Sequence, residues 1–543
     1  MSLKAIWNAI FNSKKRDFLV HKLENALMQK DSKECIKIGI AYRDGDEVEQ
    51  SLQKAHECFL KAAEMGDSEG YICLALLQCH CNNLENFDIQ VINKKALEYL
   101  EKAGNMGDSL GYILLGSIYE NANGVEQDCL KALDFYQKAV ALKEGDGLFR
   151  IGQMYEKAYI EPTQELLDEF EIDSSDSDKN ISIATQYYLI AANSMQSADA
   201  CLKIAKILYD DYKALEKDNE EKALEFHGDA IEYYQKAGEY GNPKGYTELG
   251  LIYAWGDSII EYDFEKGIKY FQKAASMGDS QAYLELGILA SVGEECSIYG
   301  FDRAITYFQK AIDMGNFEGY TKMAATYGEW AYKVDDRKQA SAYFDKSATY
   351  WQKVGEMGEF IGYFNAGRLY ESAGAMAGKD KIKGVKINEQ KAFECFLKAA
   401  NMGDTKSCLK VGVAYYDGNG VEKDYTKAFE YFHEVIKKEN NEKEKAKIKK
   451  VFYTTADILA DAHIFLGRMY ASGFGVEEDH NKAYEHFLEG AQAEVGKHQK
   501  AFAYSGIALM YHLREDDEFK ALPYYQKAAS LGNAYSINYL KNR

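Results

Sequence analysis

The chain has 543 residues, with 65 basic and 86 acidic side chains and a net charge of −21. So acidic a chain disfavours nucleic acids and anionic membranes as general partners, and it favours basic or polar proteins. Only three prolines occur, and no linker rich in proline, glycine and serine divides the chain. We therefore expect one continuous array of elements rather than several globular domains.

The first segment, residues 1–50, is predicted to hold an N-terminal helix and a degenerate first repeat. Its start, Met1–Phe11, is too short and too interrupted by asparagine for a secretory signal, so we expect a cytoplasmic protein. In this interpretation the stretch caps the first repeat. The alternative is a short amphipathic helix that lies on a membrane surface. No later segment approaches the roughly 20 apolar residues of a membrane span.

A helical hairpin recurs from residue 51 onward, and its clearest copy spans Lys95 to Asp128. We predict a first helix that opens at Lys95 and a second helix from Ser109 to Glu120. Gly107 suits the left-handed position after the first helix, and Asp108 can cap the second. Equivalent turns are Met65-Gly66-Asp67, Met277-Gly278-Asp279, Met314-Gly315-Asn316 and Met402-Gly403-Asp404, and the links between hairpins are Gly124–Asp128, Gly420–Asp424 and Gly475–Asp479.

Most second helices carry an aromatic residue, a glycine or alanine four positions on, and another aromatic residue three beyond, as in Tyr112-Gly116-Tyr119. Because these positions share one helical face, each triplet is predicted to be buried. The central glycine costs up to about 1 kcal/mol in a helix interior. We expect a neighbouring helix to approach closely there, with aromatic residues of the first helices filling the space. Further triplets are Tyr246-Gly250-Tyr253, Tyr363-Gly367-Tyr370 and Cys408-Gly412-Tyr415, and the first-helix aromatics are Tyr136, Tyr234, Phe271, Phe308, Phe396 and Phe432.

These turns, links and triplets resemble the Sel1-like repeat family, a relative of the tetratricopeptide repeats. The resemblance covers residues 51–160, 181–436 and 458–543, together with the degenerate first repeat. It implies an all-α fold, a right-handed α-solenoid of about twelve to thirteen antiparallel helix-turn-helix repeats. The link motif is eroded after Tyr155, Tyr209, Tyr327 and Tyr370.

Five insertions interrupt the period, and such insertions fall on loops or helix extensions. Residues 161–180 hold eight acidic residues. We expect a mobile acidic loop there, either a solvated charge run or a docking site for a basic partner. Asp210–Asp229 and Glu329–Tyr350 are predicted to be lengthened first helices. Gly374–Lys386 is predicted to be a basic, glycine-containing loop, and 437–457 a lysine-rich insertion.

Candidate chemistry is sparse. Cys73, Cys79, His80 and Cys81 crowd one unit, yet no C-x-x-C or H-x-x-x-H pair occurs. We expect packed free thiols, with a metal or redox site as the alternative.

Two serines match the S-x-x-K pattern of penicilloyl-serine enzymes: Ser51 with Lys54, and Ser407 with Lys410. The S-D-N and K-T-G elements of those enzymes are absent, and helix capping or packing explains both serines.

We therefore predict no catalytic, cofactor-binding or metal-binding residue. The predicted function is a non-catalytic scaffold or adaptor that binds a protein or peptide partner on the solenoid surface. The resemblance leaves two alternatives: an immunity protein that neutralises a toxin enzyme, and a repeat-scaffold hydrolase such as a β-lactam-binding enzyme.

On the exposed side of the first helices, charged pairs at i,i+4 predict a solvated, salt-bridged face. These pairs are Glu57/Lys61, Glu98/Lys102, Asp134/Lys138, Glu232/Lys236 and Glu394/Lys398.

Overall fold

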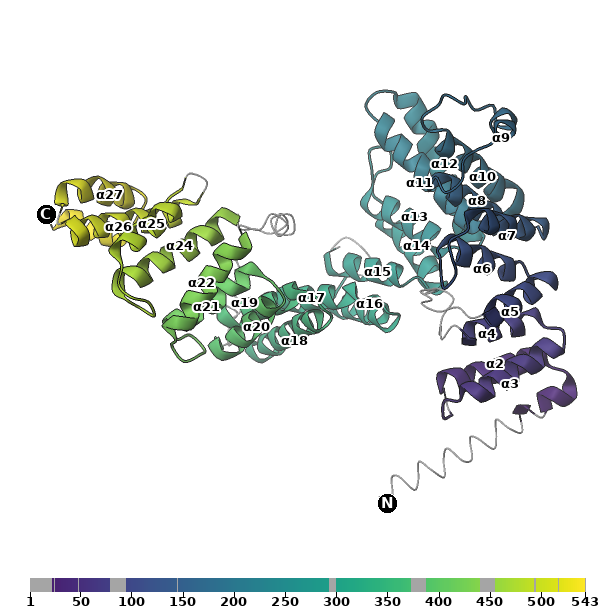
Figure 1. Cartoon of the computed structure of the whole chain (residues 1–543), viewed down its shortest axis with the longest axis horizontal. Coiled ribbons are helices and arrows are strands. Elements are labelled where there is room, and N and C mark those ends of the chain that lie inside the picture. The colour runs from purple at the N-terminus through teal and green to yellow at the C-terminus, as the bar shows by residue number, and fades with distance from the viewer. Residues whose placement is uncertain are drawn as a thin grey trace, which may run out of the picture. The chain divides into compact units, whose positions relative to one another are not determined.

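A computed structural model describes residues 22–542 except 24, 47, 79–93, 144, 293–298, 373–386, 440–454, 493–494 and 516. The regular structure in these residues is helical. The chain divides into two compact units, Met1–Asp279 and Ser280–Arg543, and each is considered by itself. In both units antiparallel helices joined by short turns pack side by side (Figure 1). The predicted helix at Met1–Phe11, the loop Gly374–Lys386 and most of the insertion 437–457 lie outside the described residues.

The first unit confirms the predicted helical repeat solenoid. Helices α5 and α6 match the predicted hairpin, and α6 has the predicted bounds. In chain order the helices are α2 (Ser32–Asp44), α3 (Leu52–Glu64), α4 (Ser68–Gln78), α5 (Lys94–Asn105), α6 (Ser109–Glu120), α7 (Cys129–Ala141), α8 (Gly145–Glu156), α9 (Gln164–Glu169), α10 (Lys179–Met195), α11 (Ala198–Leu215), α12 (Glu220–Glu239), α13 (Pro243–Trp255) and α14 (Phe264–Ser276).

The second unit continues the alternation of first and second helices. Its helices are α15 (Ser280–Val292), α16 (Phe301–Asp313), α17 (Glu318–Lys333), α18 (Arg337–Glu356), α19 (Phe360–Ser372), α20 (Glu389–Asn401), α21 (Thr405–Asp417), α22 (Tyr425–Glu439), α24 (Thr455–Ser472), α25 (His480–Gly490), α26 (Lys497–Glu515), α27 (Glu518–Ser530) and α28 (Ala534–Lys541). Within the described part of the chain, no helix combines the length and the apolarity that a membrane crossing requires.

The turns have the chemistry that the sequence predicts. Gly107 has a φ of +92°, which a side chain would strain, and Asp108 accepts a hydrogen bond from the backbone N–H of Leu110 at 3.1 Å. In the following link, Asp128 caps α7 by accepting from the N–H of Lys131 at 2.9 Å. In each connection, residues within the turn itself therefore end the preceding helix and cap the following one.

The central glycine of a second helix lies against an aromatic ring of the next first helix. A Cβ atom at Gly250 would lie 2.5 Å from the ring of Phe271, and one at Gly412 would lie 2.7 Å from the ring of Phe432. Both rings are fully buried, and burying such a ring stabilises by about 1.5–3 kcal/mol, more than the helix cost of the glycine. The prediction that close packing of a neighbouring helix offsets the cost of the glycine is confirmed. The same contact recurs at Gly116/Tyr136, Gly152/Tyr188, Gly287/Phe308, Gly367/Phe396 and Gly467/Phe487.

A buried carboxylate adds a polar tie between consecutive repeats. Glu120, at the end of α6, accepts hydrogen bonds from Tyr136 Oη at 2.7 Å and from Lys157 Nζ at 2.8 Å. Glu156 repeats the arrangement one hairpin later with Tyr188 and Lys203. Burial alone would raise the pKa of Glu156, but its bonds to Lys203 and Tyr188 outweigh burial and lower that pKa. Each of these ties holds the tyrosine ring that packs against the central glycine of the preceding second helix, Tyr136 against Gly116 and Tyr188 against Gly152. We call this space beside the glycine the glycine cradle.

The insertion Asp210–Asp229 lengthens two helices, not the first helix alone as predicted. Helix α11 runs on to Leu215 and α12 begins at Glu220. The extensions pair because the rings of Tyr212 and His227 pack edge to face at 4.8 Å. In the same way Glu329–Tyr350 is divided between α17 and α18.

The acidic insertion contains a short helix, α9, in place of the loop expected throughout. Leu167 of α9 is 4% exposed, and the ring of Phe170 meets the ring of Tyr187 edge to face at 5.7 Å. Apolar residues therefore anchor part of this segment to α10.

Replacing Gly250 with alanine tests the glycine cradle. We expect Gly250→Ala to destabilise the protein by about 1–3 kcal/mol, because the methyl group would overlap the buried Phe271 ring. The matched control is Gly228→Ala in α12, where a methyl group meets open space and should stabilise by up to about 1 kcal/mol. Urea unfolding followed by circular dichroism, with hydrogen exchange of α13 and α14, measures both. Equal effects of the two substitutions would contradict the cradle.

Candidate functional site

In several first helices two neighbouring aromatic residues point in different directions. Successive helical residues lie about 100° apart, so Phe271 enters the Gly250 cradle while Tyr270 stays at the surface, half-buried. The Tyr270 ring stacks between Tyr246 and Tyr253 of α13, with ring centroids 6.0 and 5.6 Å away and planes inclined by 27° and 13°. We call Tyr246, Tyr270 and Tyr253 the aromatic triplet of α13 and α14.

Two lysines of α14 flank this triplet. Lys266 Nζ lies 3.7 Å from the centroid of the Tyr253 ring, and Lys273 Nζ lies 5.1 Å from that of Tyr246. Each such contact stabilises by about 0.5–1 kcal/mol at an exposed site. Neither ammonium group forms an ion pair with any carboxylate of the described residues. Positive charge and aromatic rings thus share a surface of an acidic protein.

The triplet with two flanking lysines recurs in both units, each taken by itself, although Lys138 and Lys520 of these copies also pair with Asp134 and Asp517. We call the triplets with their flanking lysines the lysine–aromatic face. Its further copies are Tyr112/Phe135/Tyr119 with Lys131 and Lys138, Tyr320/Tyr350/Tyr327 with Lys346 and Lys353, and Tyr504/Tyr524/Tyr511 with Lys520 and Lys527.

Hydrogen bonds join neighbouring first helices in the first unit. Tyr270 Oη donates to the side-chain oxygen of Gln235 at 3.2 Å, which ties α14 to α12. Tyr233 Oη donates to Asn193 at 3.0 Å, which ties α12 to α10. The first helices α10, α12 and α14 therefore lie side by side and form a continuous surface.

The structure corrects the expectation that every residue of the sequence triplets is buried. Tyr246 is 8% exposed, but Tyr112, Tyr119 and Tyr253 are only half-buried. The reason is that these outer rings lean on a surface aromatic of the next first helix, whereas only the glycine between them faces the core.

The predicted salt-bridged face is present only in part. Asp134 pairs with Lys138 at 2.9 Å and Glu232 with Lys236 at 2.7 Å. Lys102 and Lys398 lie instead over the rings of Tyr71 and Tyr363. The sequence does carry a signal for this, which the sequence reasoning missed: two lysines seven residues apart on either side of a pair of large apolar residues, as Lys95 and Lys102 stand around Tyr99-Leu100.

A profile of the Sel1 repeat matches more than half of the chain. The matched residues are 35–67, 92–108, 109–143, 198–242, 243–279, 280–316, 373–404, 405–436, 460–495 and 501–533.

The chain belongs to the Sel1 repeat family. Proteins with these repeats generally mediate protein–protein interaction. The match 243–279 contains one second helix and the following first helix, so a complete aromatic triplet and its Gly250–Phe271 contact lie within one Sel1 repeat.

Several solved structures are similar to the chain. A protective antigen present in uropathogenic Escherichia coli strains, displaying an SLR fold, is 20% identical over 95% of this chain and 97% of its own, with a TM-score of 0.39. A Sel1 repeat protein from Oxalobacter formigenes is 19% identical over 70% and 95%, with a TM-score of 0.40. An immunity protein from Pseudomonas aeruginosa is 17% identical over 46% and 81%, with a TM-score of 0.30. No curated protein matches the chain.

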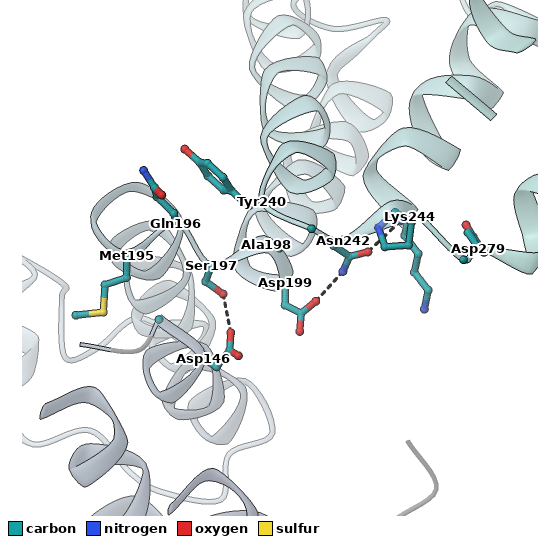
Figure 2. Close-up of a pocket in the computed structure, with 14 residues that line it drawn as sticks. Asp146, Met195, Gln196, Ser197, Ala198, Asp199, Tyr240, Asn242, Lys244 and Asp279 are labelled. Atoms are coloured by element: carbon teal, nitrogen blue, oxygen red, sulfur yellow. Dashed lines mark hydrogen bonds between the residues drawn. The ribbon is translucent and has the colours of Figure 1, made fainter. Parts of the chain in front are cut away.

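A groove of about 570 Å³ lies at a different edge of the Sel1 repeats, where the turns meet the N-termini of α8, α11 and α13 (Figure 2). Several of its polar side chains bond to one another. Ser197 Oγ donates to Asp146 at 3.2 Å, and the side-chain amide of Asn242 donates to Asp199 at 2.6 Å. The same ladder continues along the first unit as Ser32/Asp67, Ser68/Asp108 and Thr247/Asp279. This edge therefore joins repeats through their helix caps.

The two serines of the S-x-x-K patterns, Ser51 and Ser407, take part in helix capping and packing. Ser51 caps α3, and Ser407 is fully buried with its hydroxyl bonded to Asp404, the cap of α21. Lys410 turns away from Ser407 and pairs with Glu371 at 2.8 Å. The pattern does not place a lysine beside an accessible serine hydroxyl.

Cys73 is a buried free thiol, and burial raises its pKa to about 12. A thiol with such a pKa is a poor nucleophile and a poor metal ligand. Cys79, His80 and Cys81 lie outside the described residues. Among the residues that are described, no group of three histidine, cysteine or acidic side chains could hold a metal ion.

Three histidines gather between α22, α24 and α25. The Nδ1 atoms of His463 and His486 lie 2.9 Å apart, so one ring donates and the other accepts. The ring of His433 lies 6.2 Å from that of His486, and its Nε2 is buried without a hydrogen-bond partner. Burial first, and then the neighbouring histidines, lower the pKa of His463 and His486 to about 4.

This cluster predicts a loss of stability in mild acid. The unfolded histidines bind protons near pH 6.5, whereas the folded ones stay neutral until about pH 4. Their stabilising contribution is therefore complete above pH 6.5 and falls as the pH drops from 6.5 towards 4. The urea midpoint of α24 and α25, followed by hydrogen exchange at pH 7.5 and 5, should shift less in His486→Tyr than in the parent. The exposed His498, replaced by glutamine, is the control; a pH response unchanged in His486→Tyr would refute the assignment.

Proposed function

We propose that this Sel1 repeat protein is a non-catalytic scaffold that binds an extended segment of a partner protein along the lysine–aromatic face. The observation that carries the proposal is the recurrence of the stacked triplet with its two lysines, as in Tyr246/Tyr270/Tyr253 with Lys266 and Lys273. Stacked tyrosines offer apolar area at little cost in conformational entropy, and their hydroxyl groups bond to polar groups.

Regular spacing favours a long partner segment over a small molecule. Hydrogen bonds join the neighbouring first helices α10, α12 and α14, so equivalent positions follow one another along one surface. A chain that contacts several positions gains affinity from each contact without needing a deep pocket. The buried Ser407 and the paired Lys410 also favour a binding role over hydrolysis.

Photo-crosslinking in the cells that naturally produce the protein tests this role. We expect a benzophenone amino acid at Lys273, on the face, to give defined partner adducts. The same group at Gln272, an exposed neighbour pointing about 100° away, should give few or none. The readout is the adduct pattern on denaturing gels, with partner peptides identified by mass spectrometry. Adducts at Gln272 but not at Lys273 would place binding elsewhere and reject the proposal.

A further inference from the structure

One copy of the aromatic face is covered by the protein's own chain. The rings of Tyr155 in α8 and Tyr187 in α10 stack with centroids 5.6 Å apart and planes inclined by 10°. Tyr253 and Tyr270 stack in nearly the same way, at 5.6 Å and 13°. Tyr188, next to Tyr187, occupies the Gly152 cradle as Phe271 occupies that of Gly250. The two sites are therefore structurally equivalent.

The segment that covers the Tyr155/Tyr187 pair is the acidic insertion. Its Leu167 is buried, and its Phe170 meets Tyr187 edge to face at 5.7 Å. The acidic side chains remain exposed: Glu161, Glu165, Asp168, Glu169, Glu171, Asp173, Asp176 and Asp178. The molecule thus contains an example of what this face accepts, a short amphipathic segment with apolar anchors and acidic flanks.

The covered copy differs from the others in its flanking residues. Ile183 and Ile190 stand four residues before and three residues after Tyr187, where α14 has Lys266 and Lys273 around Tyr270. Ile183 is fully buried. In six further first helices both positions are basic: Lys95/Lys102, Lys131/Lys138, Arg303/Lys310, Lys346/Lys353, Lys391/Lys398 and Lys520/Lys527. In α12, α22 and α25 one position is basic and the other acidic: Asp229/Lys236, Lys427/Glu434 and Lys482/Glu489. Both flanking residues are therefore apolar where the chain covers its own face, whereas at least one of them is basic at each of the other copies.

We infer that the open copies bind acidic segments of a partner protein in which carboxylates flank a phenylalanine or leucine anchor; this inference rests on the proposed scaffold function. The anchor meets the tyrosine rings edge to face, as Phe170 meets Tyr187, and the carboxylates pair with the two lysines. Lys266 and Lys273 are seven residues apart, about 10 Å along the helix axis. Carboxylates three residues apart in an extended chain span a similar distance.

A peptide copied from the insertion serves as the probe. Residues 161–178, labelled with fluorescein, are titrated against the full-length protein and followed by fluorescence anisotropy. Because the other copies of the face stay intact, we expect the number of peptides bound per protein at saturation to fall by one when Lys266 and Lys273 are both changed to glutamate. The double variant Lys269→Glu/Lys338→Glu makes the same change in net charge at exposed lysines without ring contacts, and it should bind like the parent. Circular dichroism verifies that each variant is folded.

Altered peptides separate the two parts of the recognition. A peptide with Leu167→Ala and Phe170→Ala should lose the anchor, and one with all acidic residues amidated should lose the lysine contacts, so each should bind at least tenfold more weakly. Binding of the parent peptide should also fall between 50 and 500 mM salt, because ion pairs at an exposed surface are screened. An unchanged number of bound peptides in Lys266→Glu/Lys273→Glu would mean that these lysines do not hold the peptide, and equal binding of the amidated peptide would mean apolar contact alone. Either result overturns the inference.

The crosslinking experiment distinguishes failure of this inference from failure of the scaffold function. Partner peptides captured at Lys273 should be acidic and contain phenylalanine or leucine. Neutral or basic captured segments would refute the acidic-partner assignment and leave the scaffold function standing. Absence of both adducts and peptide binding would reject both.

Discussion

The array depends on one contact, that of a buried aromatic ring with a glycine in the preceding helix. Phe271 against Gly250 shows the constraint: a smaller ring residue would leave a cavity, and any side chain on the glycine would overlap the ring. The contact sets the spacing of adjacent helices. The tie from Tyr136 to Glu120 and the ladder of helix caps join the repeats at that spacing. Packing, polar ties and turn geometry therefore all repeat with the same period.

Much of this fold could be predicted from the sequence because its decisive signals are local. The capping aspartates and left-handed glycines of a turn act within a few residues of one another, so the hairpin of α5 and α6 follows from its own segment. The glycine in a helix interior was also informative, because it carries a local cost that only a close neighbour offsets. Gly412 with Phe432 shows that the neighbour is a first-helix aromatic, as expected.

The candidate site was harder to predict because it depends on contacts between helices. Whether Lys102 pairs with Glu98 or lies over Tyr71 depends on where the preceding helix places the tyrosine, which spacing along α5 alone does not indicate. The same limit applies to the acidic insertion. Its charge predicted a solvated loop, but Leu167 and Phe170 found apolar partners on α10. That the acidic insertion packs on α10 can be inferred only when the positions of the aromatic rings of α10 are known.

The residue that packs the core and the residue that forms the surface are direct neighbours, as in Tyr270 and Phe271. Both lie within one matched repeat together with the helix that receives them. Duplication of such a repeat would therefore copy a core contact and a surface position in a single event. An array that grows in this way gains length and valency together, while a one-residue insertion between the helix cap and the aromatic pair would exchange the two roles.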